Sequence, residues 1–135
     1  MIKDTISFRQ DMIDAIVSGE KTQTRRMMKP QPIKSFPECP YLENTVLTIQ
    51  DTNIKIRVLD VYSEPLNWIT DAEAVQEGVE ICNPYTGLSG DGTPIESEHI
   101  DKSPVDYFQE LWNSIYNNWD DNPWVWVITF KLEEK

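Results

Sequence analysis

The stretch SFRQDMIDAIVSGEKTQTRR, residues 7–26, joins a helical pattern directly to a strand pattern. Its first part carries apolar side chains at the three- and four-residue spacing of one helix face: Phe8, Met12, Ile13 and Ile16. Ser7 and Gln10 fit a capping box at the start, and Gly19 fits the left-handed residue that commonly ends a helix. We therefore expect a short helix within residues 7–19.

A strand is expected to follow at Thr22–Met27. There, the β-branched residues Thr22 and Thr24 alternate with long polar side chains. Pro30 and Pro32 come next, and proline cannot donate to the hydrogen-bond ladder of a sheet. The strand is therefore expected to end before Pro30.

The other strands are predicted further along the chain. Residues 45–50 and 54–62 fit a hairpin with a turn near residues 51–53, because apolar side chains alternate along its second arm. Residues 124–132 alternate between two largely apolar sets over their whole length. That pattern is typical of a central strand that is covered on both faces.

Two more helices are predicted from capping residues at their N-termini. Thr70-Asp71-Ala72-Glu73 is a capping box, and Gly78 fits the end of the helix that it opens. Ser103 suits an N-cap and Pro104 the first helical position of the other helix. Short strands with three helices, and without a βαβ repeat, predict an α+β fold in which a mixed β-barrel carries helices at its rim.

The chain length of 135 residues fits one domain, so we expect a single domain over residues 1–135. The proline-rich segment 30–40 is expected to be a loop. Residues 80–102 hold three glycines and two prolines without a clear period, which predicts a long surface excursion.

The net charge of the chain limits which partners it is expected to bind. With 12 basic and 23 acidic side chains the net charge is −11, so non-specific binding to duplex DNA is not expected. Residues 21–34 nevertheless contain no acid and five cations: Lys21, Arg25, Arg26, Lys29 and Lys34. No apolar run is long enough to cross a membrane and the start lacks a secretory signal, so we expect a cytoplasmic location and no membrane partner.

Metal and cofactor sites are not expected. Cys39 and Cys82 lie far apart, with no second Cys or His nearby to complete a chelating spacing, so we expect two reduced thiols. His99 lies in an acidic segment and is expected to be an exposed loop residue. Asp120-Asp121 precede Asn-Pro and are expected to be turn residues rather than cation ligands.

The segment Gly19-Glu20-Lys21-Thr22-Gln23-Thr24-Arg25-Arg26 gathers two hydroxyls and three cations directly after a helix end. The pattern G-x-K-T-x-T-x-R, followed by the capping-box helix and a terminal W-V-I-x-F strand, resembles the ASCH domain of the PUA-like superfamily. The similarity covers Ile6–Arg26, Ile69–Gly78 and Pro123–Phe130. Together with N-P-W-V-W-V at residues 122–127, the segment is also similar to ASCH proteins encoded by phages and prophages.

One ASCH branch consists of small amidohydrolases that remove the acetyl group from N(4)-acetylcytidine. The resemblance implies that Lys21, Thr24 and Glu77 would be catalytic, although the register also allows Glu73 as the carboxylate. Thr24 would be the nucleophile and Lys21 its base, while Glu77 would orient the lysine or shuttle a proton. This chain is longer than those enzymes, because it has the segments 30–40 and 80–102.

The residue types fit this chemistry, because cleaving an amide needs a nucleophile, a base and an acid for the leaving amine. Burial of Lys21 beside Arg25 and Arg26 would lower the pKa of its amine, as a base requires. Thr22, Arg25 and Arg26 are expected to contact the substrate, and Arg26 could hold a carbonyl oxygen or a phosphate, or be a salt-bridged strand residue. Lys21 must precede the regular strand, because otherwise it would face away from Thr24.

Two further functions are consistent with the sequence. The chain could be a noncatalytic RNA-binding ASCH module that uses the same basic segment, or a phage or prophage protein that binds host proteins through its acidic surface. The expected partner is therefore a small nucleoside or single-stranded RNA. The oligomeric state stays open.

Overall fold

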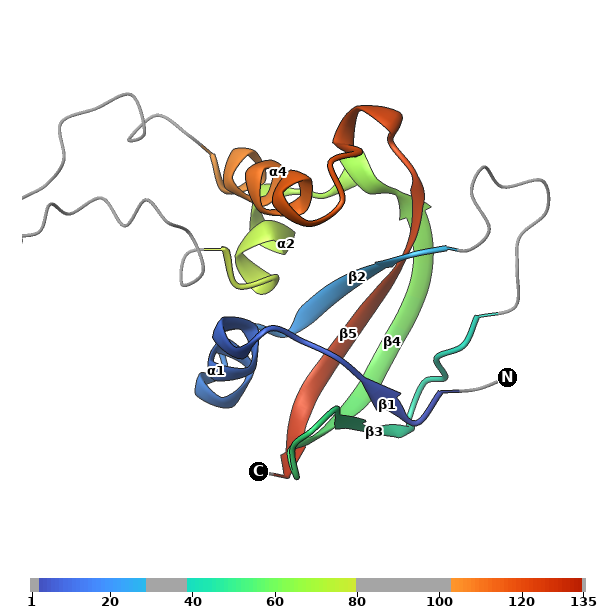
Figure 1. The fold of residues 1–135 in the computed structure, drawn as a ribbon. Coiled ribbons are helices and arrows are strands. Elements are labelled where there is room, and N and C mark those ends of the chain that lie inside the picture. The colour runs from blue at the N-terminus through green and yellow to red at the C-terminus, as the bar shows by residue number, and fades with distance from the viewer. Residues whose placement is uncertain (1–2, 29–38, 80–102, 135) are drawn as a thin grey trace, which may run out of the picture.

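The computed structural model of the protein describes residues 3–28, 39–79 and 103–134 (Figure 1). Most of the expected loop at 30–40 and the whole expected excursion at 80–102, with Cys82 and His99, lie outside these residues. No helix in the described ranges is long and apolar enough to cross a membrane.

A five-stranded sheet forms the centre of the fold. Its strands are β1 (Thr5–Ile6), β2 (Gln23–Met27), β3 (Val46–Ile49), β4 (Lys55–Pro65) and β5 (Trp124–Glu134). They are ordered β1-β3-β4-β5-β2, with β1 parallel to β3 and the other neighbours antiparallel. The α+β class is confirmed. Because β1 and β2 occupy the two edges of the described sheet, closure into a barrel is not confirmed.

The long strands β4 and β5 lie side by side and curve together through the molecule (Figure 1). The predicted hairpin is confirmed as β3 and β4, and Pro65 ends β4 where a proline is tolerated. The predicted central strand is also confirmed, since β5 pairs with β4 on one side and with β2 on the other. Gln23 of β2 lies opposite Thr129, and Met27 lies opposite Val125.

Within the described ranges, the sheet is accompanied by the α-helices α1 (Gln10–Ser18), α2 (Asp71–Gln76) and α4 (Pro104–Ile115). The short 3-10 helix η1 (Leu66–Trp68) leads into α2, and the short 3-10 helix η3 (Trp119–Asp121) leads into β5. The capping boxes of α2 and α4 are confirmed. Gly19 ends α1 with φ of 86°, the left-handed conformation that glycine adopts without strain.

The capping box expected at Ser7 and Gln10 is wrong. Arg9 is the N-cap of α1 and makes no side-chain capping bond. Ser7 instead lies between β1 and the helix, where its carbonyl oxygen accepts a hydrogen bond from Arg26 Nη2 at 2.7 Å. A residue distant in sequence therefore contacts the segment just before this helix start.

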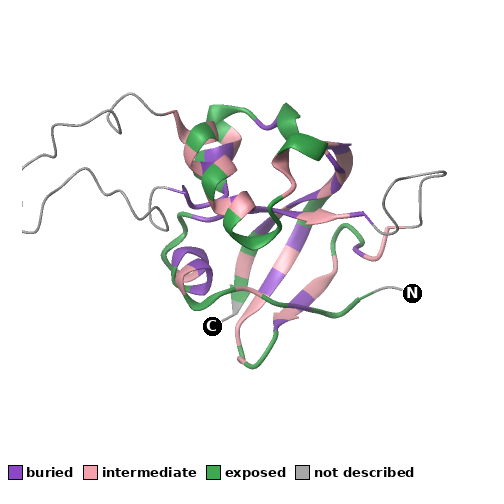
Figure 2. Ribbon diagram, turned by 45° about the horizontal axis from the view of Figure 1, so that its top comes forward, coloured by how far each residue is buried: buried purple, intermediate pink, exposed green. Residues whose placement is uncertain are grey.

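The alternation of β5 divides the core into two clusters. Val125 and Val127 pack with α2 and α4, whereas Ile128 and Phe130 pack with α1, β3 and the first part of β4. Both faces of the strand are consequently covered: buried and partly buried positions alternate along most of it, and the neighbours Val127 and Ile128 are both buried (Figure 2). β2 and α2 lie where these two clusters meet, and the candidate site is built from them.

Candidate functional site

Lys21 lies in the short connection between α1 and β2, as the geometry of the motif requires. Its backbone N–H donates to the Ala15 carbonyl at 3.1 Å, which ties the connection back onto the helix. Gly78, which has φ of 90°, lies against it, since a Cβ there would be 3.3 Å from the Lys21 Cβ. Lys21 thus reaches the end of α2 because the two chain segments approach each other closely.

The amino group of Lys21 is buried among oxygen acceptors. Nζ donates to the Gln23 carbonyl at 2.8 Å, to the Glu77 carbonyl at 2.9 Å and to Glu77 Oε1 at 3.1 Å. The side chains of Lys21 and Glu77 are only 2% and 5% exposed. A lysine ammonium has three N–H donors, and these acceptors engage all of them.

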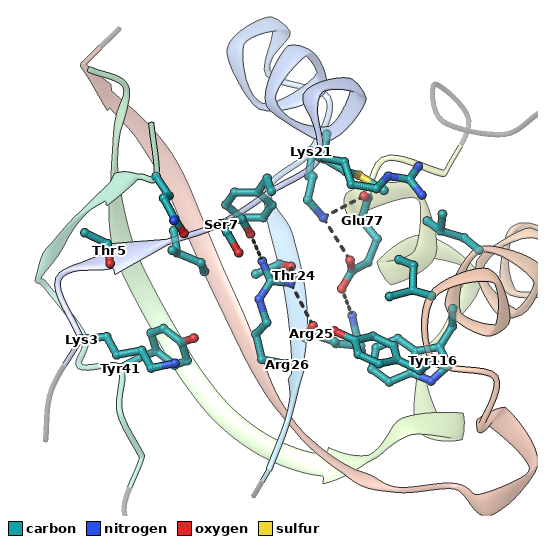
Figure 3. Close-up of a pocket in the computed structure, with 18 of the residues that line it drawn as sticks. Lys3, Thr5, Ser7, Lys21, Thr24, Arg25, Arg26, Tyr41, Glu77 and Tyr116 are labelled. Carbon is teal, nitrogen blue, oxygen red and sulfur yellow. Dashed lines mark hydrogen bonds and ion pairs between the residues drawn. The ribbon is translucent and has the colours of Figure 1, made fainter. Parts of the chain in front are cut away.

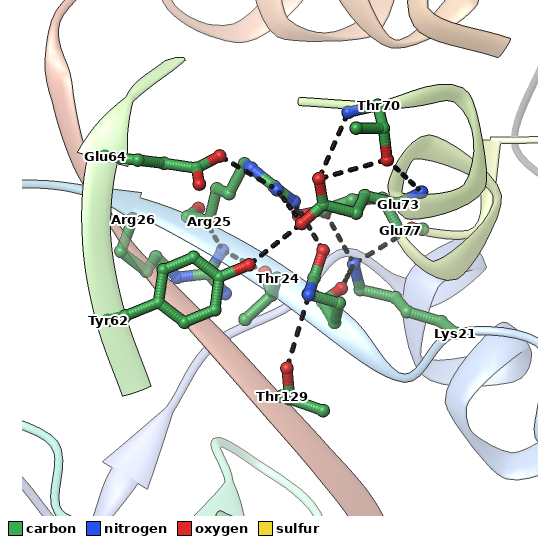
Figure 4. A network of polar contacts seen from close by, with 11 residues as sticks. Lys21, Thr24, Arg25, Arg26, Tyr62, Glu64, Thr70, Glu73, Glu77 and Thr129 are labelled. Carbon is green, nitrogen blue, oxygen red and sulfur yellow. Dashed lines mark hydrogen bonds and ion pairs between the residues drawn. The ribbon is translucent and has the colours of Figure 1, made fainter. Parts of the chain in front are cut away.

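Arg25 is the centre of a wider buried network (Figure 4). Its Nη1 donates to Glu77 Oε2 at 2.9 Å, and its Nη2 donates to Glu73 Oε2 at 3.1 Å and to Glu64 Oε2 at 3.5 Å. The side chain is 0% exposed, and its Nε has no hydrogen-bond partner. Lys21 therefore lies beside a carboxylate that it shares with Arg25, a partner that the expectation of burial beside Arg25 and Arg26 did not include.

Tyr62 of β4 closes this network at Glu73. Its hydroxyl donates to Glu73 Oε2 at 2.8 Å, while Glu73 Oε1 accepts from the Thr70 N–H and hydroxyl in the capping box. Burial together with the neighbouring Glu73 and Glu64 raises the pKa of Tyr62 to about 12. The Tyr62 hydroxyl therefore stays a hydrogen-bond donor at neutral pH.

The carboxyl groups of the network respond differently to their surroundings. Burial raises the pKa of Glu64, and Arg25 only partly opposes this. Burial also acts to raise the pKa of Glu73, but hydrogen bonds from Tyr62 and Thr70 and the charge of Arg25 outweigh it, so the pKa lies below its ordinary value. Glu73 is thus held ionised by its donors.

Thr24 and Arg26 project from the opposite face of β2. Thr24 is 1% exposed, and its Oγ1 accepts a hydrogen bond from Arg26 Nη1 at 2.8 Å. The Arg26 guanidinium lies over the ring of Phe8, with Cζ 4.8 Å from the ring centroid, and Lys21 Nζ lies 5.7 Å from the same centroid. The amine and the guanidinium therefore both lie close to the Phe8 ring.

These residues line a cavity of about 810 Å³ between β1, β2, α1 and α4 (Figure 3). Lys21, Thr24 and Glu77 all contribute to its lining. Aromatic rings form much of the remaining wall: Phe8, Tyr41, Phe108, Trp112 and Tyr116. The volume lies in the range of roughly 300–1,000 Å³ that is common for pockets that bind small molecules.

The other predicted site residues lie in different settings. Thr22 is not among the described residues that line the cavity, and its backbone pairs with Gln76 and Phe130. Of the two candidate carboxylates, Glu77 contacts Lys21, whereas Glu73 contacts Arg25 and Tyr62. Arg25 and Arg26 both reach the cavity lining.

Sequence reasoning missed Tyr41, Tyr62 and Glu64 at this site. They come from the segment before β3 and from the far end of β4, and no local motif links them to the basic segment. The alternation of β4 places Tyr62 and Glu64 on one face, but only the pairing of β4 with β5 brings that face towards Arg25. That pairing is long-range, so a single sequence carries little signal for it.

Remaining candidates do not join the site. Asp120 and Asp121 belong to η3, outside the cavity lining. Cys39 is a free thiol, and burial raises its pKa. Within the described ranges, no group of three or more His, Cys, Asp or Glu side chains is arranged to hold a metal ion.

Neither a protein-family model nor a curated protein sequence matches this chain. Solved structures do match it. The crystal structure of an ASCH domain from Lactobacillus crispatus JV V101 has a TM-score of 0.53 and 18% identity, and the match covers 96% of this chain and 80% of that chain. The crystal structure of the hypothetical protein PH0355 has a TM-score of 0.52 and 12% identity, covering 94% and 95%. This chain therefore has an ASCH-like fold.

Proposed function

We propose that this chain with an ASCH-like fold is an amidohydrolase that cleaves the exocyclic amide of an acetylated cytidine nucleoside. The observation that carries the proposal is the buried contact of Lys21 Nζ with Glu77 Oε1 at 3.1 Å, on the lining of the same cavity as Thr24. A hydroxyl, an amine and a carboxylate at one cavity are the groups that this reaction needs.

In the proposed reaction, Thr24 Oγ1 attacks the carbonyl carbon of the acetyl group. For Lys21 to take the hydroxyl proton it must first be neutral, and Glu77, which is in direct contact, is the group that accepts the lysine proton. The leaving exocyclic nitrogen then takes a proton from Lys21. Water hydrolyses the acetyl ester on Thr24, so the net change is one amide and one water to one amine and one acetate.

Arg26 and Arg25 have different parts in this scheme. Arg26 already donates to Thr24 Oγ1 at 2.8 Å, so its guanidinium is placed to stabilise negative charge that develops next to that oxygen. Arg25 acts through Glu77, because it occupies Oε2 and leaves Oε1 for Lys21. We therefore treat Arg25 as a positioning residue and not as a substrate contact.

The direct test is acetate release from N(4)-acetylcytidine by the purified protein, with cytidine measured in parallel. Thr24→Val should lower kcat/KM on the order of 10³-fold or more, because the nucleophile is removed while the shape of the side chain is kept. Thr22→Val is the matched control, since Thr22 neighbours the site in sequence but does not line the cavity. It should keep near-normal turnover.

Two results would contradict the proposal. One is the absence of acetate release by folded wild-type protein, and the other is an equal effect of Thr24→Val and Thr22→Val. In either case a noncatalytic RNA-binding module would become the leading interpretation, and single-stranded RNA binding would be the measurement to make next.

A further inference from the structure

The cavity continues well beyond Lys21 and Thr24, towards the N-terminal strand. Its far end is lined by residues that the proposed reaction does not use, among them Lys3, Thr5 and Tyr41. The Lys3 N–H donates to the Pro40 carbonyl at 2.8 Å, which places Lys3 beside Tyr41, and Lys3 Nζ lies 5.8 Å from the centroid of the Tyr41 ring.

Tyr41 lines the cavity, and its hydroxyl is accessible from the cavity rather than sealed in the core. The residue is 6% exposed and packs in the core, yet no described residue forms a hydrogen bond with its hydroxyl. In Figure 3 that hydroxyl points towards Arg26. Because the hydroxyl faces the cavity, a group that enters the cavity can accept its hydrogen bond in place of water.

Two cations, Lys3 and Arg26, line this part of the cavity. Among the described residues, no carboxylate forms an ion pair with Lys3 or Arg26. A guanidinium has five N–H donors, and the hydrogen bonds of Arg26 to Thr24, Arg25 and Ser7 use three of them. In a chain of net charge −11, two such cations facing one cavity favour an anionic ligand.

Asp4 is the opposing charge at this end, and it is exposed at the edge of the cavity. Burial raises the pKa of Tyr41, although Arg26 opposes the shift, so the phenol is protonated and able to donate at neutral pH. A phenol donor between an ammonium and a guanidinium matches the oxygens of a phosphate group.

We propose that Lys3, Arg26 and Tyr41 form a phosphate subsite, so that the cavity takes a cytidine nucleotide with its base at Lys21, Thr24 and Glu77. This inference rests on the proposed cytidine substrate and narrows it. A free nucleoside would leave the Tyr41 hydroxyl and the Lys3 ammonium without an anion. The phosphate can belong to a free nucleotide or to the 5′ end of an RNA strand.

Calorimetric titration with cytidine 5′-monophosphate and with cytidine tests the subsite on the full chain. The wild-type protein should bind the nucleotide about tenfold more tightly than the nucleoside, the factor expected of one added charge-assisted contact. Tyr41→Phe and Lys3→Met should each remove most of that preference without changing the affinity for cytidine. Lys131→Met is the matched control, since Lys131 is an exposed lysine on β5 outside the cavity.

Equal affinity of the wild-type protein for nucleotide and nucleoside would overturn the subsite, as would the same loss in Lys131→Met. Acetate release without a preference for the nucleotide would support the proposed function and contradict the phosphate subsite. A preference for the nucleotide without acetate release would support the phosphate subsite and contradict the proposed function. A trinucleotide starting with 5′-phosphocytidine identifies the source of the phosphate, because only a strand-end site binds it as tightly as the free nucleotide.

Discussion

Arg25 and Arg26 are neighbours on β2, yet their guanidinium groups lie in opposite kinds of surroundings. Arg25 faces the ends of α2 and β4, is fully buried and meets the carboxylates of Glu64, Glu73 and Glu77. Arg26 faces the cavity, is partly buried and meets two carbonyls, a hydroxyl and an aromatic ring. Adjacent residues of one type therefore have different partners because a strand sends successive side chains to opposite faces.

This difference separates a face of β2 that stabilises the structure from a face that is available to a ligand. On the Arg25 face, most donors and acceptors are paired with each other, so the network fixes positions but leaves little free to bind a ligand. On the Arg26 face, donors remain unused, and the cavity gives a ligand access to them. Glu77 connects the two faces, because one carboxylate oxygen contacts Arg25 and the other contacts Lys21.

The largest effect should come from Arg25→Met. Removing this guanidinium leaves Glu64 and Glu73 without their cation and Glu77 with Lys21 alone, so the free energy of unfolding should fall by about 3–5 kcal/mol. Urea denaturation followed by tryptophan fluorescence measures it. Arg57→Met is the matched control, since Arg57 also forms a bidentate pair, with Glu133 at 2.7 Å, but on the surface. The midpoint of that variant should stay close to wild type.

A similar decrease in the free energy of unfolding in both variants would contradict this prediction, because burial would then not be what distinguishes Arg25 from Arg57. A small loss in Arg25→Met alone would show that the carboxylates protonate at little cost.

A smaller effect is expected for Tyr62→Phe, which removes the hydroxyl that donates to Glu73 at 2.8 Å. The free energy of unfolding should fall by about 1 kcal/mol at neutral pH. The pKa of Tyr62 is raised from 10.0 to about 12 in the folded state. As pH rises through this window, the unfolded state binds fewer protons than the folded state, so the stability contributed by Tyr62 is lost.

Urea titrations at a series of pH values measure this dependence. The stabilities of wild type and Tyr62→Phe should differ below pH 10.0 and converge as the pH approaches about 12. A difference that stays constant over this range would mean that the phenol does not keep its proton through the contact with Glu73. The difference between the two proteins isolates Tyr62, because all other tyrosines are common to both.

The smallest stability effect is expected for Arg26→Met. Methionine keeps the stem packed near Phe8, and the lost hydrogen bonds go to groups that line a cavity, where water can replace the guanidinium. We expect a loss below about 1 kcal/mol by urea denaturation. A loss equal to that of Arg25→Met would contradict the division of β2 into a supporting face and a cavity face.

The sequence patterns predicted much of this architecture. The helix before the basic segment, the hairpin, the two other capped helices and the central strand all follow local rules of spacing and capping, and each is present. The sequence also predicted that Lys21 lies ahead of the regular strand, because strand alternation and the glycine at residue 19 restrict where Lys21 can lie.

Patterns could not distinguish Arg25 from Arg26, because both belong to one basic run. Their partners are decided by α2, β4 and the end of β1, which reach β2 only through tertiary packing. The same reason explains the error at Ser7, where a carbonyl bonded by Arg26 lies just before the true helix start. Local propensity therefore described the elements well but not the contacts between them.

Two of the oxygens that hold the Lys21 amine belong to the same residue, the carbonyl and the carboxylate of Glu77 at the end of α2. The amine is therefore held between a helix end and a strand start, because the Gln23 carbonyl at the start of β2 accepts its remaining hydrogen bond. A shift of α2 along its axis moves both Glu77 oxygens together, so both hydrogen bonds to the amine lengthen at once. The rigidity of that helix end thus determines how precisely the Lys21 amine is positioned.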